Sequence, residues 1–319
     1  MKFLIIVLII AAVLLLLDLL LGVAFFYFAL GPKKREDPKV PCKGSLFERN
    51  ADNINLINGY KWFDETEHEE LLIPSHEKGK HLHGQYFTGD SEKWAIVIHG
   101  WTNINREMSS YAMEYYNRGY SVILPDLRGH GNSETKWVSM GWLDRLDIVD
   151  WINYIVKNHP NAQIVIHGVS MGAATTMMTT GEKLPENVVC AIEDCGFCSV
   201  YDIFEDQSRR KYHIPPAISM PPASFVNFIM NGFRFKQGSA VKQLEKSKTP
   251  TLFMHGDKDD FVLFENLDKV YNACAAEKEK YVIHGAEHAV SSHWFHEEYW
   301  NRVDEFLAKH VKSEESTVL

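Results

Sequence analysis

The feature that most constrains the fold is the pentapeptide Gly168-Val169-Ser170-Met171-Gly172, near the middle of this 319-residue chain. It follows an apolar, β-branched run at residues 163–166 and precedes the small residues Ala173-Ala174-Thr175. Glycines on both sides of the serine permit a sharp strand-to-helix turn, because side chains there would collide with neighbouring backbone. The pattern therefore predicts a buried strand, a serine hydroxyl projected beyond its end, and a helix.

After residue 40 the chain alternates short apolar runs with helical patterns. Continuous apolar or β-branched runs predict strands at residues 94–98, 120–124, 163–166, 188–192, 251–254 and 280–283. Helical patterns are present at residues 108–117, 171–182, 264–275 and 293–310. Residues 54–63 and 83–87 are interpreted as antiparallel hairpin strands. This order predicts an α/β fold, with a mostly parallel central sheet covered by helices on both faces.

One further helix is predicted after the strand at residues 120–124. Its apolar residues recur three or four positions apart, which is the spacing of a single helical face. This stripe comprises Trp142, Leu146, Val149, Ile152 and Val156. We expect the stripe to face the sheet.

Residues 197–236 interrupt the alternation with prolines and apolar side chains. Because proline breaks helices and strands, this segment is predicted to be a cap inserted above the sheet. Its aromatic and methionine side chains are candidates for the lining of an apolar substrate pocket, since methionine adapts to varied ligands. The candidates are Phe204, Met220, Phe228 and Met230. The alternative is that they only bury a small core of the cap itself.

The first thirty residues are apolar from Phe3 to Leu30 except for Asp18. A helix needs about 20 such residues to cross a bilayer, so the run predicts one transmembrane helix. A cleaved signal peptide is the alternative, but its apolar region usually has only ~7–15 residues, and Pro32 follows the one small-residue site. The predicted organisation is an anchor at 1–31, a charged linker at 32–50 and an α/β domain at 51–319, with the cap at 197–236.

The flanking charges bear on which side of the membrane holds the α/β domain. Lys33, Lys34, Arg35 and Lys39 follow the apolar run, whereas Lys2 and the terminal amine precede it. Basic residues near a span tend to stay in the cytoplasm, and scattered cysteines agree with a reducing compartment. These features favour a cytoplasmic domain. A short N-terminus with one lysine also resembles a secretory anchor, which would place the domain outside.

Four more motifs accompany the serine turn in a fixed order. His99-Gly100-Trp101 follows the strand at residues 94–98, and Asp126-Leu-Arg-Gly-His-Gly-Asn-Ser133 follows the next strand. The later two motifs are His255-Gly-Asp-Lys-Asp-Asp-Phe-Val262 and Gly285-Ala-Glu-His288. Together the motifs resemble the landmarks of the α/β-hydrolase superfamily of serine hydrolases, over residues 71–310. Closest in character are bacterial membrane-anchored members and the serine-aminopeptidase-like and acyl-esterase branches, which no motif here separates.

The resemblance implies a catalytic triad of Ser170, Asp259 and His288. A serine hydroxyl is a weak nucleophile and needs a nearby base, and histidine suits both the uptake and the return of its proton. The aspartate would fix the histidine tautomer and stabilise the imidazolium. Asp257 and Asp260 in the same loop are rivals for the acid, as is Asp194 at the end of a strand. The motif register favours Asp259.

The resemblance also implies an oxyanion hole formed by the backbone N–H groups of Trp101 and Met171. Met171 would lie at a helix N-terminus, where the helix dipole favours negative charge. Other histidines match no zinc-binding spacing and are interpreted as structural hydrogen-bonding residues: His99, His130, His167, His255 and His284. No metal or other cofactor is implied.

Composition makes nucleic acid a poor partner and leaves three functional hypotheses. The formal net charge is -9, and no basic stripe is present that could neutralise phosphates. Cys195 and Cys198 form a C-x-x-C after a late strand, outside the usual redox context, and are interpreted as buried or partly buried thiols. The first hypothesis is an esterase that forms an acyl-enzyme with a small or lipid-like acyl substrate. The alternatives are a peptidase or amidase of the same fold and a catalytically silent, membrane-anchored binding protein; the oligomeric state stays open.

Overall fold

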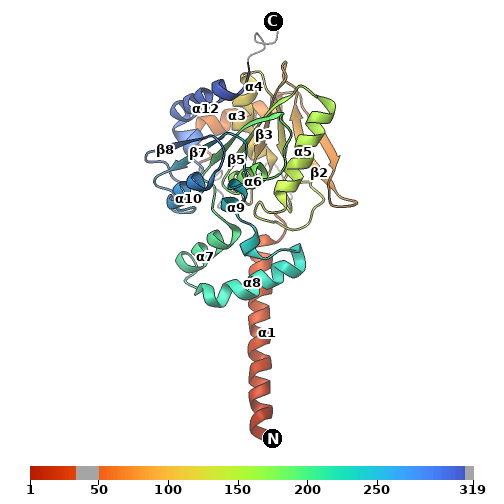
Figure 1. Ribbon diagram of the computed structural model, residues 1–319, viewed down its shortest axis with the longest axis vertical. Helices are drawn as coiled ribbons and strands as arrows, with labels where there is room; N and C mark the ends of the chain where they lie inside the picture. The colour runs from red at the N-terminus through yellow and green to blue at the C-terminus, as the bar shows by residue number, and fades with distance from the viewer. Residues whose placement is uncertain (34–49, 313–319) are drawn as a thin grey trace.

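The computed structural model describes residues 1–33 and 50–312, and its centre is an eight-stranded sheet (Figure 1). The strand order is β1-β2-β4-β3-β5-β6-β7-β8. The pairs β1/β2 and β2/β4 are antiparallel, and all other pairs are parallel. The strands are β1 (Glu69–Pro74), β2 (His81–Phe87), β3 (Lys93–Ile98), β4 (Ser121–Pro125), β5 (Gln163–Val169), β6 (Val188–Asp194), β7 (Thr251–Gly256) and β8 (Lys278–Ile283). The predicted α/β fold with a mostly parallel sheet is confirmed.

Helices cover both faces of this sheet. One face packs against α3, α4 and α12, and the other against α5, α6, α9 and α10. The strand β3 shows why the apolar runs are continuous, since its successive side chains are buried alternately in the two core layers. The helices are α3 (Ile54–Glu65), η1 (Asn105–Met108), α4 (Ser109–Asn117), α5 (Asp144–Asn158), α6 (Met171–Thr180), α9 (Ala240–Leu244), α10 (Glu265–Ala273), α11 (Ser291–Trp294) and α12 (His296–His310).

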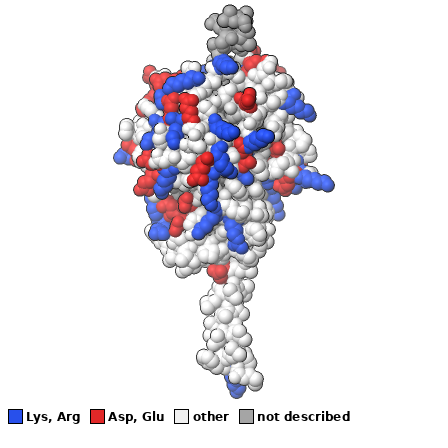
Figure 2. Space-filling model, in the orientation of Figure 1, with Lys and Arg blue, Asp and Glu red and all other residues white. Residues whose placement is uncertain are grey.

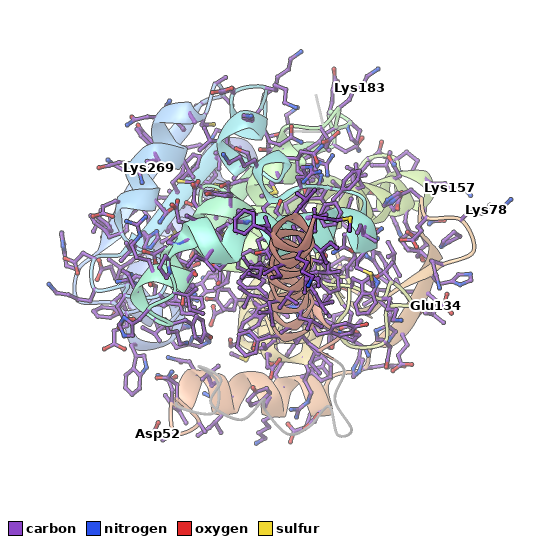
Figure 3. The ribbon with its side chains drawn as sticks, turned by 90° about the horizontal axis from the view of Figure 1, so that it is seen from below. Asp52, Lys78, Glu134, Lys157, Lys183 and Lys269 are labelled. Carbon is purple, nitrogen blue, oxygen red and sulfur yellow. The ribbon has the colours of Figure 1, made fainter. Side chains whose placement is uncertain are left out.

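The N-terminal helix α1 (Lys2–Leu30) projects from the domain, and the cap packs around its base (Figures 1 and 3). The cap consists of α7 (Val200–Arg210), α8 (Pro216–Asn231) and the short η2 (Phe235–Gln237). Near the base of α1, Phe26, Ala29 and Leu30 belong to the same buried core as the sheet. The last two turns of α1 are therefore part of the folded domain. Lys34, Arg35, Lys39 and Cys42 lie outside the described residues.

Two local predictions are wrong, and the first concerns residues 54–63, which form the helix α3 rather than a strand. Asn53 caps its N-terminus, because its Oδ1 accepts hydrogen bonds from the backbone N–H groups of Asn55 and Leu56, at 2.9 and 3.4 Å. The residues that α3 buries include Leu56 and Phe63, seven positions apart on one helical face. The antiparallel partner of β2 is instead β1, an edge strand whose mostly exposed sequence gave no clear pattern.

The second wrong prediction concerns the buried stripe of α5. The helix is present, but it buries Ile148, Trp151, Ile152 and Ile155, and of the predicted stripe only Ile152 is fully buried. The sequence carries two overlapping stripes with helical spacing, and both fit a period of about 3.6 residues. The packing against β1 and α6 selects one of them.

Candidate active site

Ser170 lies at the turn between β5 and α6 with a left-handed backbone, at φ 58° and ψ -115°. A positive φ is unfavourable for a residue with a side chain and is concentrated at functional turns. A Cβ at Gly168 would lie 2.1 Å from the carbonyl oxygen of Gly172, and one at Gly172 would lie 2.1 Å from that of Ile98. Only glycine fits at both positions, so the two glycines allow the turn to close and project Ser170 beyond the end of β5.

His288 joins Ser170 to Asp259 through hydrogen bonds on both ring nitrogens. Its Nε2 lies 2.9 Å from the Oγ of Ser170, and its Nδ1 lies 2.7 Å from the Oδ2 of Asp259. All three side chains are at least nine-tenths buried. They follow β5, β7 and β8, whose carboxyl ends meet at one edge of the parallel sheet. The structure thus brings together all three residues of the predicted triad.

Four hydrogen bonds hold the carboxylate of Asp259. Its Oδ1 accepts from the backbone N–H groups of Phe261 and Val262, both at 2.9 Å, and its Oδ2 accepts from His288 and His255. Burial by itself would raise the pKa of Asp259, but the charge of His288 and the hydrogen bonds from both histidines lower it. An ionised Asp259 keeps the proton of His288 on Nδ1, so Nε2 can accept the proton of Ser170.

His255, at the end of β7, is the structural hydrogen-bonding residue that the sequence predicts, and its partner, the acid Asp259, is the new finding. Its Nε2 lies 3.1 Å from the Oδ2 of Asp259 and 2.9 Å from the carbonyl oxygen of Val262. Burial would lower its pKa, but the hydrogen bond to Asp259 and the charge of that carboxylate raise it. The available signal is its position four residues before Asp259 in the same motif.

The three rival acids lie elsewhere. Asp257 accepts hydrogen bonds from the Nδ1 of His284 at 2.9 Å and the backbone N–H of Gly285 at 2.8 Å, which ties two loops together. Asp260 is exposed. Asp194 is buried, and burial raises its pKa to about 6. In the described part of the chain, none of the three is hydrogen-bonded to His288.

The two predicted oxyanion donors flank Ser170. The loop that contains Trp101 passes close by, since a Cβ at Gly100 would lie 3.4 Å from the Cβ of Ser170. Met171 is the first residue of α6, so its N–H has no partner within the helix. Over residues 1–33 and 50–312, neither N–H group has a hydrogen-bond acceptor. This arrangement suits an oxygen that becomes negatively charged during a reaction at Ser170.

An apolar pocket of about 320 Å³ opens beside Ser170. The cap lines it through Ile203, Phe204 and Ile214, among others. The N-terminal helix supplies further lining residues, which no pattern in the sequence predicts: Leu21, Ala24, Phe25, Phe28 and Ala29. The helix α1 is apolar on all sides, so its sequence does not indicate which face packs against the domain.

Of the four cap candidates for this pocket, only Phe204 lines it. Met220 is buried in the core, and Met230 is half-buried against it. Phe228 is 46% exposed. The three α8 residues do not line the pocket because α8 packs against α1, and α1 rather than α8 forms a wall of the pocket.

A second, more polar pocket of about 530 Å³ meets the first at Ser170. It contains His288 and polar or charged side chains from four segments: Thr102, Asn103, Arg210, Lys211, Asp260 and Glu287. Ser170 therefore separates an apolar compartment from a polar one. This division suits a substrate with an apolar acyl group on one side of the scissile bond and a polar group on the other.

Within the described ranges, two clusters have the spacing of metal ligands, with donor atoms within 4.8 Å of one another: Cys195, Asp259 and His288, and His76, Asp147 and Asp150. In the first cluster burial raises the pKa of the Cys195 thiol, which keeps it a poor ligand. In the second cluster the Nε of Arg128 lies 2.7 Å from the Oδ2 of Asp147, so the guanidinium group already supplies a positive charge to this carboxylate. The four described cysteines are buried free thiols: Cys190, Cys195, Cys198 and Cys274. This agrees with the interpretation of Cys195 and Cys198 from the sequence.

Comparison with known proteins identifies the family. Residues 107–314 match the model of the prolyl oligopeptidase family. This range contains Ser170, Asp259 and His288. The uncharacterized protein YqkD of Bacillus subtilis is 27% identical over 292 residues, which cover 91% of this chain and 92% of YqkD.

Two solved structures show the same fold. The esterase Pf2001 of Pyrococcus furiosus is 24% identical with a TM-score of 0.63, covering 79% of this chain and 96% of the esterase. The acylaminoacyl peptidase of Pyrococcus horikoshii is 17% identical with a TM-score of 0.59, covering 79% of this chain and 43% of the peptidase. Because one is an esterase and the other a peptidase, the shared fold does not select between ester and peptide bonds.

Proposed function

This chain belongs to the prolyl oligopeptidase family of α/β-hydrolases, and from that premise we propose that it cleaves acyl esters through Ser170, His288 and Asp259. The observation that carries the proposal is the hydrogen-bonded chain from the Oγ of Ser170 through His288 to Asp259, at 2.9 and 2.7 Å. A catalytically silent binding protein has no need of this intact chain, so it favours an enzyme.

The first half of the reaction transfers the acyl group to Ser170. Its Oγ attacks the carbonyl carbon of the ester while its proton passes to the Nε2 of His288, and Asp259 stabilises the resulting imidazolium. The N–H groups of Trp101 and Met171 stabilise the oxyanion, and each such donor contributes ~3 kcal/mol in a dry site. The ester C–O bond then breaks, and His288 gives the proton to the departing alcohol.

The second half releases the acyl group. A water molecule enters through the polar pocket, gives its proton to the Nε2 of His288 and attacks the acyl carbon. The bond to Ser170 breaks, its Oγ recovers a proton from His288, and a carboxylic acid leaves. The polar pocket supports this step because it reaches both His288 and Ser170.

The pockets favour an ester over a peptide. Few polar atoms line the apolar pocket beside Ser170, and these include the side chains of Gln207 and Ser208. A peptide substrate carries many backbone N–H and C=O groups that need partners when they are buried. The hydrocarbon part of an acyl chain carries no such polar groups. A peptidase remains the second candidate because the triad geometry serves both bonds and because the polar pocket is the larger one.

We further propose that α1 anchors the hydrolase domain to a membrane. It is the one described helix long and apolar enough to cross a bilayer. The predicted organisation stands as part of the proposal, with an anchor at 1–31, a linker at 32–50 and a hydrolase domain at 51–319, and the last two turns of the anchor pack into that domain. The basic residues after α1 favour a cytoplasmic domain. External protease on intact cells tests this orientation, since cleavage of the domain before lysis would overturn it.

A fluorophosphonate probe tests the proposed nucleophile. We expect the wild-type protein to be labelled once and to hydrolyse p-nitrophenyl esters, and Ser170→Ala to lose both, with turnover lower by about 10⁴-fold or more. Ser121→Ala is the matched control, because Ser121 is another buried serine, on β4, that accepts a hydrogen bond from Gly89. Labelling that persists in Ser170→Ala would overturn the assignment. Aminoacyl nitroanilides cleaved faster than esters would favour the peptidase.

A further inference from the structure

One wall of the apolar pocket comes from the helix α1. Its lining residues are Leu21, Ala24, Phe25, Phe28 and Ala29. Counted from Leu21 they recur at three, four, seven and eight positions, which places them on a single helical face. At about 1.5 Å per residue this face runs about 12 Å along α1. The pocket therefore extends from Ser170 along the helix toward its exposed part.

Buried contacts fix this wall in place. Phe26 and Leu30 are fully buried, and the backbone N–H of Val138 donates a 3.0 Å hydrogen bond to the carbonyl oxygen of Leu30. A Cβ at Gly22 would lie 2.6 Å from the carbonyl oxygen of Pro222. The helix α8 thus crosses α1 in direct backbone contact at Gly22. The base of α1 is a structural wall of the pocket.

The length of α1 places this crossing at the edge of a bilayer. Every residue of α1 before Leu21 is exposed, and α1 carries almost no charge below the domain (Figure 2). About 20 apolar residues span the ~30 Å hydrocarbon core, and counted from Phe3 that length ends at Gly22. Asp18 lies one turn inside this boundary, close to the headgroups. Leu21, at the outer end of the pocket, lies at the boundary itself.

The helix α8 turns an apolar face outward where it crosses α1. Its exposed apolar residues are between 44% and 61% accessible: Ile218, Phe225, Phe228 and Ile229. The guanidinium of Arg234 borders this face, 5.0 Å from the ring of Phe228. Apolar side chains with a cationic edge are typical of helices that lie in a membrane interface. Viewed along α1, the labelled charges such as Lys157 and Lys269 lie at the periphery, away from the helix (Figure 3).

We propose that the substrate is a single-chain acyl ester of the membrane, a monoacylglycerol or lysophospholipid, whose chain passes from the leaflet along α1 into the apolar pocket. This inference rests on the proposed function of Ser170. A chain that moves between leaflet and pocket at this depth does not expose its methylenes to water. The pocket volume of about 320 Å³ is near the lower end of the ~300–1,000 Å³ range of ligand pockets, which suits one acyl chain.

The polar pocket receives the head group of this lipid. Lys211 lines both pockets, and its Nζ lies 5.5 Å from the ring of Phe261, which also lines both pockets.

In the reaction the acyl group passes from the ester oxygen to the Oγ of Ser170, and the alcohol leaves with the proton that His288 carries. Water then releases the fatty acid, which returns to the leaflet. The head group leaves as an alcohol on the aqueous side.

The test compares two phenylalanine substitutions in α1 in the full-length protein, reconstituted in phosphatidylcholine nanodiscs. Ala24→Phe fills the pocket, whereas Ala12→Phe adds the same side chain to an exposed position outside it. The readout is the ratio of monooleoylglycerol turnover to p-nitrophenyl acetate turnover. Each methylene that can no longer enter lowers binding by about fourfold, so we expect this ratio to fall at least about tenfold in Ala24→Phe. Ala12→Phe should keep the wild-type ratio.

The outcomes separate this inference from the proposed function. An unchanged ratio in Ala24→Phe, or wild-type protein that hydrolyses the acetate but not the embedded lipid, overturns the membrane substrate alone. Wild-type protein without any ester turnover or fluorophosphonate labelling overturns the proposed function. If Ala24→Phe loses acetate turnover as well, Leu21→Trp at the outer end of the pocket repeats the comparison.

A second measurement needs no variant. A long-chain alkyl fluorophosphonate with a terminal diazirine attaches to Ser170 and, after irradiation, cross-links to the wall that its chain contacts. We expect mass spectrometry to find the cross-link on α1 between Leu21 and Phe28. A cross-link on Thr102 or Asn103, in the polar pocket, would overturn the proposed path of the chain.

Discussion

The indole Nε1 of Trp101 donates a 2.9 Å hydrogen bond to the carbonyl oxygen of Ala29. This bond joins the loop beside Ser170 to the last turn of α1, and the ammonium of Lys33 lies 4.9 Å from the same indole ring. The last four carbonyls of a helix lack partners within the helix, and Trp101 satisfies one of them. The position of the proposed oxyanion donor therefore depends on the N-terminal helix.

Trp101→Phe tests this dependence. The ring is kept, but the hydrogen bond to Ala29 is lost, and such a bond contributes about 1 kcal/mol net. We expect kcat for esters to fall roughly fivefold, measured in nanodiscs, because the loop is less firmly held. Trp62→Phe is the control, since the ring of Trp62 stacks on that of Phe87, with the two ring centroids 4.5 Å apart, at a place away from Ser170. Equal kcat values in the two variants would mean that the loop is positioned without α1.

Asp259→Asn tests the acid of the triad. Asparagine cannot stabilise the imidazolium and favours the wrong tautomer of His288, so we expect kcat to fall by about 10⁴-fold. Asp257→Asn serves as the control, because Asp257 bonds His284 and Gly285 rather than His288. Steady-state kinetics with p-nitrophenyl acetate measure both. A larger loss in Asp260→Asn would show that the motif register is displaced by one residue.

Gly22→Ala tests the contact between α1 and α8. In a helix interior, alanine is normally more stable than glycine by about 0.8–1 kcal/mol. Here the added Cβ meets the carbonyl oxygen of Pro222 at 2.6 Å, so we expect the opposite sign. The thermal midpoint in detergent should fall by roughly 2–10 °C. Ala12→Val, which adds bulk to an exposed position of the same helix, should change little; a rise in Gly22→Ala would refute the close contact.

Glu193→Gln tests the dependence of stability on pH. Glu193 is buried at the end of β6, and burial raises its pKa to about 8. The unfolded chain releases this proton near pH ~4.3, so between there and pH 8 the folded state binds more protons and stability falls as pH rises. We expect the wild-type thermal midpoint to decline from about pH 5 to about pH 8 and the variant to decline less.

Two further features sharpen this test. Glutamine keeps an oxygen that can accept the 3.0 Å hydrogen bond from the backbone N–H of Gly196. Glu245→Gln is the control, because Glu245 is exposed and should show the wild-type slope. Parallel slopes in all three proteins would mean that Glu193 is ionised in the folded state.

Much of the fold follows from local patterns. The continuous apolar runs of β3 and β5 reflect burial on both faces of a sheet, which the sequence expresses directly. The misread helix α3 shows the limit of such patterns. Its residues 54–63 fit a strand when taken alone, and what selects the helix is the capping by Asn53 together with packing on α4. The edge strand β1 is mostly exposed and leaves little pattern to read.

The sequence by itself determined the turn at Ser170 and the candidate triad. The glycines around Ser170 are needed locally, and the carboxyl ends of parallel strands meet at one edge, so motifs after β5, β7 and β8 must converge there. Only the tertiary structure decided that α1 forms a wall of the pocket. An amphipathic helix shows its buried side through periodicity, but α1 is apolar all round, so nothing in its sequence marks the face that packs beside Trp101 and Phe204. Shape selects that face, through the backbone contact of Gly22 with Pro222 and the hydrogen bond from Trp101 to the carbonyl oxygen of Ala29 in the last turn of the helix.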